Sequence, residues 1–169
     1  MSEYGPFLRT ISLFRELDAE ELEAIGRLLV VTEFEPGELI LEEGQPNRAL
    51  HLVAEGRVRV SCRAEEGDVI LCDLPAGRTF GELSILEEGF ASATLRAIPK
   101  TKILSLSLAD LHRILREAPA TAAKFWHAIA LDLRQRLVQT NAVVRTYFEV
   151  NRALVENPTF REAYAVMAK

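Results

Sequence analysis

Between residues 30 and 107 the chain is broken into short apolar runs by turn-forming residues, and this pattern constrains its fold more than any other feature. Turns are predicted where Pro, Gly, Asn or Asp gather, at 35–38, 44–47, 55–56, 65–68 and 75–77. Apolar and polar residues alternate in runs such as 57–60, as in strands with one buried face. Strands this short, spaced by about 8–12 residues, predict a mainly β sandwich or barrel.

Helical periodicity precedes and follows this β region. Asp18 and Glu21 have the spacing of a capping box, so a helix is predicted to begin after Asp18. The apolar residues between 22 and 29 would form the buried face of that helix. A second helix is predicted after Leu108 and should end before Pro119.

A long helix is predicted over about 120–150, with an apolar stripe that recurs about every four residues. The members of the stripe are Phe125, Ile129, Leu133, Leu137, Val144 and Phe148. A second copy of the same helix would cover its far end, so we expect a homodimer through this helix. The predicted domains are residues 1–118 for the N-terminal helices and β region, 119–150 for the long helix, and 151–169 for a short helical tail.

Residues 80–97 hold the most specific motif in the sequence. They contain Phe80-Gly81-Glu82-Leu83, a loop, and then Ala91-Ser92-Ala93-Thr94. This run resembles the phosphate-binding cassette of the cyclic nucleotide-binding domain family, the sensor domain of catabolite-activator-type proteins. The resemblance covers roughly residues 7–140. It implies a mainly β fold with flanking helices, in which an eight-stranded jelly roll (a double-stranded β-helix barrel) is followed by a long C-terminal helix.

The resemblance also implies which residues contact a ligand. They are Phe80, Gly81, Glu82, Leu83, Ala91, Ser92 and Ala93. Gly81 would let the backbone approach a phosphate, and Ser92 would offer a hydroxyl. Glu82 would accept a hydrogen bond from a ribose hydroxyl. Because a Glu that opens a helix is also favoured by the helix dipole, a purely structural role for Glu82 stays open.

Ala91 departs from the family pattern, which has an arginine at this place to neutralise the phosphate. Loss of one partner of a buried charge pair costs about 2–5 kcal/mol, which would weaken binding by roughly thirty- to several-thousand-fold. Arg78 and Arg96 are alternative cations, since Arg96 shares its strand parity with Ser92 and Thr94. The opposing interpretation leaves both arginines on the surface.

Thr140 and Asn141 are further candidates, because the family places purine contacts on the long helix. Thr140 matches the family pattern, whereas Asn141 stands where a serine is frequent. The Asn141 amide could still donate to and accept from a purine edge. Alternatively, it is a polar residue that sets the register of a helix pair.

Charge and motifs argue against other functional classes. The net charge is −5, which disfavours nucleic acid, and the segment after the long helix is too short for the family's DNA-binding domain, so we expect no direct DNA binding. Neither a membrane-spanning run nor a signal peptide is visible, which predicts a cytoplasmic protein without membrane contact. The three histidines, His51, His112 and His127, do not form a metal-binding pattern. No catalytic motif is visible, so we expect neither an enzyme nor a required cofactor.

The sequence therefore predicts a regulatory or sensor module that couples a small-ligand pocket to a dimerising helix. A cyclic nucleotide is the possible ligand, with weakened or altered binding of cyclic AMP or cyclic GMP, and a protein partner would receive the output. The alternative is a ligand-free, degenerate member of the family that acts as a structural or protein-interaction dimerisation module.

Overall fold

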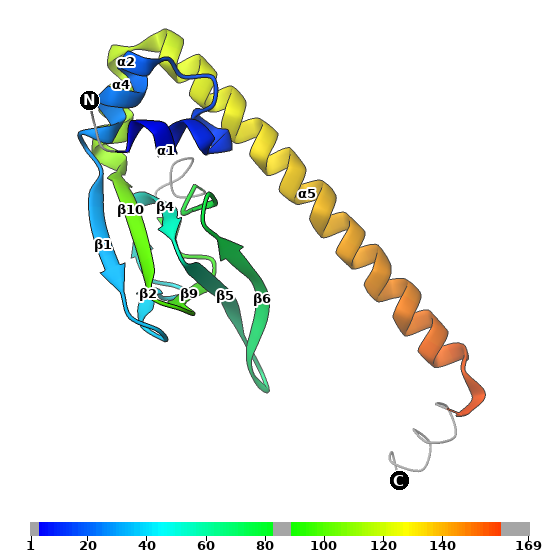
Figure 1. Cartoon of the computed structure of the whole chain (residues 1–169). Helices are drawn as coiled ribbons and strands as arrows, with labels where there is room; N and C mark the ends of the chain where they lie inside the picture. Colours follow the sequence, from blue (N-terminus) through cyan, green and yellow to red (C-terminus); the bar gives the residue numbers. More distant parts are fainter. Residues whose placement is uncertain (1–3, 83–88, 160–169) are drawn as a thin grey trace. The chain divides into compact units, whose positions relative to one another are not determined.

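The computed structural model describes residues 4–82 and 89–159 (Figure 1). Its first helices are α1 (Gly5–Thr10), the 3₁₀ helix η1 (Ser12–Phe14) and α2 (Ala19–Gly26). The capping box predicted for α2 is confirmed: Asp18 Oδ1 accepts hydrogen bonds from the N–H groups of Glu20 and Glu21, and Glu21 Oε2 accepts one from the Asp18 N–H. This pairing fixes the start of α2.

Ten strands follow within the described residues. They are β1 (Val30–Phe34), β2 (Leu39–Leu41), β3 (Pro46–Asn47), β4 (Ala49–Glu55), β5 (Arg57–Ala64), β6 (Gly67–Pro75), β7 (Thr79–Phe80), β8 (Gly89–Phe90), β9 (Thr94–Ala97) and β10 (Thr101–Ser107). Two four-stranded sheets have the orders β1-β10-β4-β7 and β2-β9-β5-β6, and β3 pairs with β8. All of these pairs are antiparallel.

One apolar core joins the two four-stranded sheets. Val53 of β4, Phe80 of β7 and Ile103 of β10 come from the first sheet. Val58 of β5 and Leu95 of β9 come from the second sheet and belong to the same buried cluster. Two sheets of four strands around one core confirm the predicted jelly-roll class, with helices before and after the β region.

The two last helices are α4 (Leu108–Glu117) and α5 (Pro119–Glu156). Ser107 caps α4, because its hydroxyl accepts a hydrogen bond from the Asp110 N–H at 3.1 Å. The long helix was expected over about 120–150, and α5 extends beyond that end to Glu156. The helical tail expected at 151–169 lies partly outside the described residues, which end at 159.

The chain forms two compact units, residues 1–129 and 130–169. In the first unit the start of α5 packs on the N-terminal helices: Phe125 is 1% exposed, and its ring centroid lies 6.2 Å from that of Phe14. Ile129 is the last buried residue of α5. In the second unit α5 carries exposed apolar side chains, of which Leu137 is 62% and Phe148 67% exposed.

Candidate ligand-binding site

A tight turn at Gly81 follows β7 and begins the cassette motif. Gly81 has a φ of +80°, which side chains with a Cβ rarely adopt. A Cβ at this position would lie 2.5 Å from Asn47 Nδ2 and 2.7 Å from the Ala49 carbonyl oxygen. Gly81 is therefore required both by its backbone conformation and by the close approach of β3 and β4. Glu82, the next residue, is 6% exposed, and Leu83 lies outside the described residues.

His51 of β4 packs next to this turn. Its ring stacks on Phe80 with centroids 4.8 Å apart. Nδ1 lies 2.8 Å from Ser105 Oγ, and Nε2 lies 3.1 Å from Asn47 Oδ1. The Asn47 amide in turn donates to the Ala49 carbonyl at 2.9 Å. Burial lowers the pKa of His51 to about 4, so the ring is neutral near pH 7.

The sequence did not single out Asn47 or His51 as parts of the site. Their signal is weak, because a turn asparagine and a single histidine on a strand are each common in folds of any function. The register of β4 against β7 and β10 places His51 opposite Phe80 in one ladder and Ser105 in the other, and Asn47 of β3 contacts the same ring. Only this three-strand arrangement shows that they support the turn at Gly81.

The second half of the cassette is fixed by its backbone. The Ala91 N–H donates to the Gln45 carbonyl at 2.8 Å, and the Ala91 carbonyl accepts from the Gly44 N–H at 2.9 Å. Ala91 is 8% exposed and Ala93 7% exposed, whereas Ser92 between them is exposed. Ala91 is thus buried, and both its N–H and its C=O are hydrogen-bonded to the 44–45 turn.

Neighbouring side chains of the cassette have other partners or are exposed. Thr94 Oγ1 accepts a hydrogen bond from the Glu43 N–H at 3.2 Å. Phe90, which precedes Ala91, is 69% exposed.

Arg96 of β9 is exposed, whereas Thr94, two residues earlier on the same strand, is buried. The Arg96 guanidinium donates to the Gly37 carbonyl at 3.2 Å. Arg78, the other alternative cation, is half-buried, and its carbonyl accepts from the Val53 N–H at 3.0 Å.

Thr140 and Asn141 lie on α5 in the second unit, where both are exposed. Their contact with a ligand, and the alternative role of Asn141 in a helix pair, stay predictions. Within the described part of the chain, no three His, Cys, Asp or Glu side chains come together as a metal-binding group.

The profile of the cyclic nucleotide-binding domain matches residues 31–118, which includes every strand except the first residue of β1. The chain belongs to the cyclic nucleotide-binding domain family. The family resemblance read from the cassette is therefore confirmed, and the chain is related to regulators and channels that carry this domain.

Two relatives and one solved structure illustrate the family. The cyclic AMP receptor protein of Thermus thermophilus is 31% identical over 156 residues, which cover 92% of this chain and 68% of that protein. A putative potassium channel protein of Rhodopseudomonas palustris is 32% identical over 114 residues, covering 68% of this chain and 27% of the channel. The N-terminal domain of a Streptomyces coelicolor transcriptional regulator has 29% identity and a TM-score of 0.69, covering 81% of this chain and 94% of that domain.

The chain thus spans about a quarter of the channel's length, and the domain occurs in proteins with different outputs. Within residues 4–82 and 89–159, no helix combines the length and the apolar character needed to cross a bilayer.

Proposed function

We propose that this cyclic nucleotide-binding domain is a regulatory module with weakened or altered nucleotide binding, whose output passes through α5. The observation that carries the proposal is the buried alanine at position 91, within an otherwise well-built cassette. The turn at Gly81 is tightly held, and Glu82 and Ala93 are buried beside it. The family resemblance implies an anion site here, in which Ala91 would place a methyl group where the family pattern has a guanidinium.

The missing charge sets the expected affinity. A phosphate diester transferred from water needs charge-assisted hydrogen bonds, and an arginine provides two in a fixed geometry. Without the arginine, only backbone amides and the Ser92 hydroxyl would be left to replace the water molecules that the phosphate loses on binding. Loss of about 2–5 kcal/mol corresponds to roughly thirty- to several-thousand-fold weaker binding of cyclic AMP or cyclic GMP. The same change would reduce the affinity for a less strongly hydrated ligand by a smaller factor.

The output is proposed to be a change in a homodimer formed by α5, or the binding of a protein partner to it. Beyond Ile129 the helix carries a long set of exposed apolar side chains, which a second copy of α5 would bury. The net charge of −5 argues against direct contact with DNA. In this proposal the chain acts by binding and has no catalytic activity.

The decisive experiment restores the charge. Calorimetric titration of the wild type with cyclic AMP and cyclic GMP is expected to show dissociation constants weaker than about 10 μM, and Ala91→Arg should tighten binding by at least ten-fold. A second variant with one extra residue before position 91 tests whether the length of the loop that precedes Ala91 also limits binding. The matched control is Phe90→Arg, which adds the same charge at the adjacent, 69% exposed position and should leave affinity unchanged.

Two outcomes contradict parts of the proposal. Tight binding by the wild type would show that another cation replaces the arginine, and loss of that binding in Arg78→Gln would identify it. If neither the wild type nor the charge-restored variants bind, the alternative function is favoured, in which a ligand-free module dimerises through α5. The exposed apolar residues of α5 support that alternative as well as the first proposal.

A further inference from the structure

Helix α5 begins without a carboxylate of its own. Its first residue is Pro119, and its first turn contains no acidic residue. The N-terminal end of a helix carries partial positive charge from unpaired N–H groups, and a nearby carboxylate stabilises it. A carboxylate from another element can therefore stabilise the start of this 38-residue helix.

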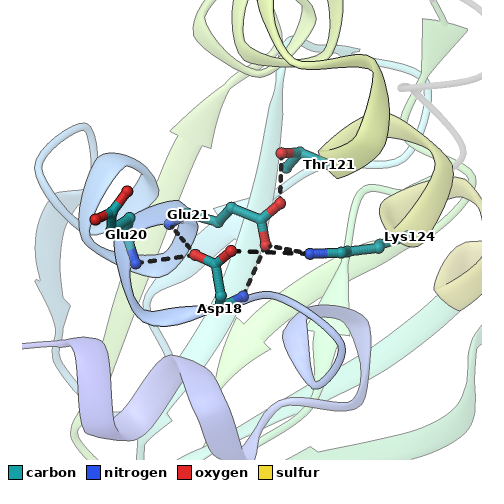
Figure 2. Close-up of polar contacts among 5 residues, drawn as sticks. All are labelled: Asp18, Glu20, Glu21, Thr121 and Lys124. Carbon is teal, nitrogen blue, oxygen red and sulfur yellow. Dashed lines mark hydrogen bonds and ion pairs between the residues drawn. The ribbon is translucent and has the colours of Figure 1, made fainter.

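Glu21 of α2 supplies that carboxylate (Figure 2). Its Oε1 accepts a hydrogen bond of 2.6 Å from the hydroxyl of Thr121, in the first turn of α5. Its Oε2 accepts one of 2.8 Å from Lys124 Nζ, one turn further along. Thr121 is 5% exposed, and the Glu21 side chain is 14% exposed. The contact is therefore largely shielded from water, where such charge-assisted bonds are strongest.

The same carboxylate also caps its own helix. Glu21 Oε2 accepts the Asp18 N–H at 2.7 Å, while Asp18 accepts the N–H groups at the start of α2. Lys124 Nζ also lies 4.0 Å from Oδ2 of Asp18, whose side chain is 63% exposed, so the cation of α5 is hydrogen-bonded to Glu21 and close to the second carboxylate of the capping box. Burial alone would raise the pKa of Glu21, but hydrogen bonds from Lys124, Thr121 and Asp18 outweigh it and lower this pKa.

We propose that Glu21 is a shared cap that makes the start of α2 and the docking of α5 a single cooperative unit. Detaching the first turns of α5 would remove two of the three donors to Glu21, which would keep only the hydrogen bond from the Asp18 N–H. The N-terminal helices therefore sense whether α5 is docked. The inference rests on the proposed function only in taking α5 as the output element, and it requires no ligand.

Two further contacts join α5 to the segment that precedes α2. Phe125 packs on Phe14 of η1, and His127 Nδ1 lies 3.4 Å from Glu16 Oε1. These contacts hold α5 on the N-terminal helices, but they do not touch the start of α2. Lys124 also lies near the Asp18 carboxylate, but Glu21 hydrogen-bonds both to the start of α2 and to α5, and this difference makes the proposal testable.

Amide hydrogen exchange of the full chain, without any nucleotide, tests the shared cap. Thr121→Val and Lys124→Met change only α5, yet exchange in residues 19–26 of α2 is expected to rise on the order of ten-fold, as for loss of a hydrogen bond to a charged group. Thr121→Ser keeps the hydroxyl and should restore protection. In the reverse direction, Glu21→Gln should raise exchange in residues 119–129 of α5.

The control for Glu21 is Glu20→Gln. Glu20 lies in the same turn of α2 and carries the same charge, but its side chain points away from α5 in Figure 2. It should leave exchange in residues 119–129 unchanged. The proposal is overturned if the α5 variants raise exchange in α5 alone, or if Glu20→Gln acts like Glu21→Gln. Because the assay contains no nucleotide, failure of ligand binding and failure of the shared cap are distinguished.

Discussion

At the scale of single residues, small side chains and a neutral histidine shape the described part of the candidate site beside the buried Glu82. Gly81 combines a left-handed backbone with a close approach to Asn47, and the buried Ala91 leaves no side chain long enough to reach a phosphate. The imidazole of His51 is held between Asn47 and Ser105 as a neutral support. Under the proposed function, such a cassette would bind strongly only those ligands that lose little hydration on entry.

Gly81→Ala is expected to destabilise the domain by more than the strain of its φ alone. Gly44 provides the comparison, because its φ is +79° but nothing lies within 4 Å of an added Cβ. Gly44→Ala should cost about 1–2 kcal/mol, and Gly81→Ala at least about 1 kcal/mol more, since the new methyl meets Asn47 and Ala49. Urea denaturation of both variants measures this difference, and equal costs would show that the turn moves freely away from β3 and β4.

The buried His51 predicts a dependence of stability on pH. Its pKa is lowered to about 4 in the folded state, against about 6.5 in the unfolded chain. The unfolded state therefore binds more protons in this window, and stability falls as pH drops from about 6.5 towards 4, with a slope of at most ~1.4 kcal/mol per pH unit. The measurement is the difference between wild type and His51→Gln in urea denaturation. An unchanged slope in the variant would contradict the assignment.

At the scale of elements, α5 changes character at Ile129. Up to that residue it is a docked helix with buried Thr121, Phe125 and Ala128, and beyond it the apolar residues are exposed. The sequence predicted the helix and its stripe, because periodicity is a local property. It could not predict the length of the docked part, since that depends on which side chains of η1 and α2 reach α5.

Phe125→Ala is expected to cost about 3–5 kcal/mol, because it removes a buried aromatic side chain that packs on Phe14. Phe148→Ala is the matched control on the same helix, at a 67% exposed position, and should cost less than about 0.5 kcal/mol. The fluorescence of Trp126 reports unfolding in urea. The measurement is made over a range of protein concentrations in which the unfolding midpoint stays constant. Similar costs for the two variants would show that docking extends past Ile129.

At the scale of the whole molecule, the chain separates into a domain that holds the cassette and a helical unit with an exposed apolar surface. The jelly-roll class was predictable from turn spacing and the cassette motif. The supports of the site were not, because Asn47 and His51 meet Gly81 only through the pairing of separated strands. The contact of Glu21 with Thr121 joins residues 100 positions apart and was equally inaccessible to local patterns.

The proposed dimer is tested by charge. The chain has a mass of 18.9 kDa, and light scattering at micromolar concentration is expected to give twice that value. Leu137→Glu with Val144→Glu should halve the measured mass and leave the circular dichroism of the β-rich unit unchanged, because two charges would face the helix pair. Gln135→Glu with Gln139→Glu adds the same charge at exposed polar positions. A monomeric wild type, or equal effects of the two double variants, would exclude this interface.

Because the Glu21 carboxylate contacts the starts of two helices, it also limits which substitutions these positions can accept. Replacing Glu21 by a residue that caps only α2 would leave Thr121 and Lys124 without the carboxylate that accepts their hydrogen bonds. Replacing Lys124 would remove a hydrogen bond to Glu21 and so destabilise the start of α2. Homologous chains should therefore exchange these positions together or not at all, so that a pair of sites a hundred residues apart accumulates substitutions as if they were neighbours.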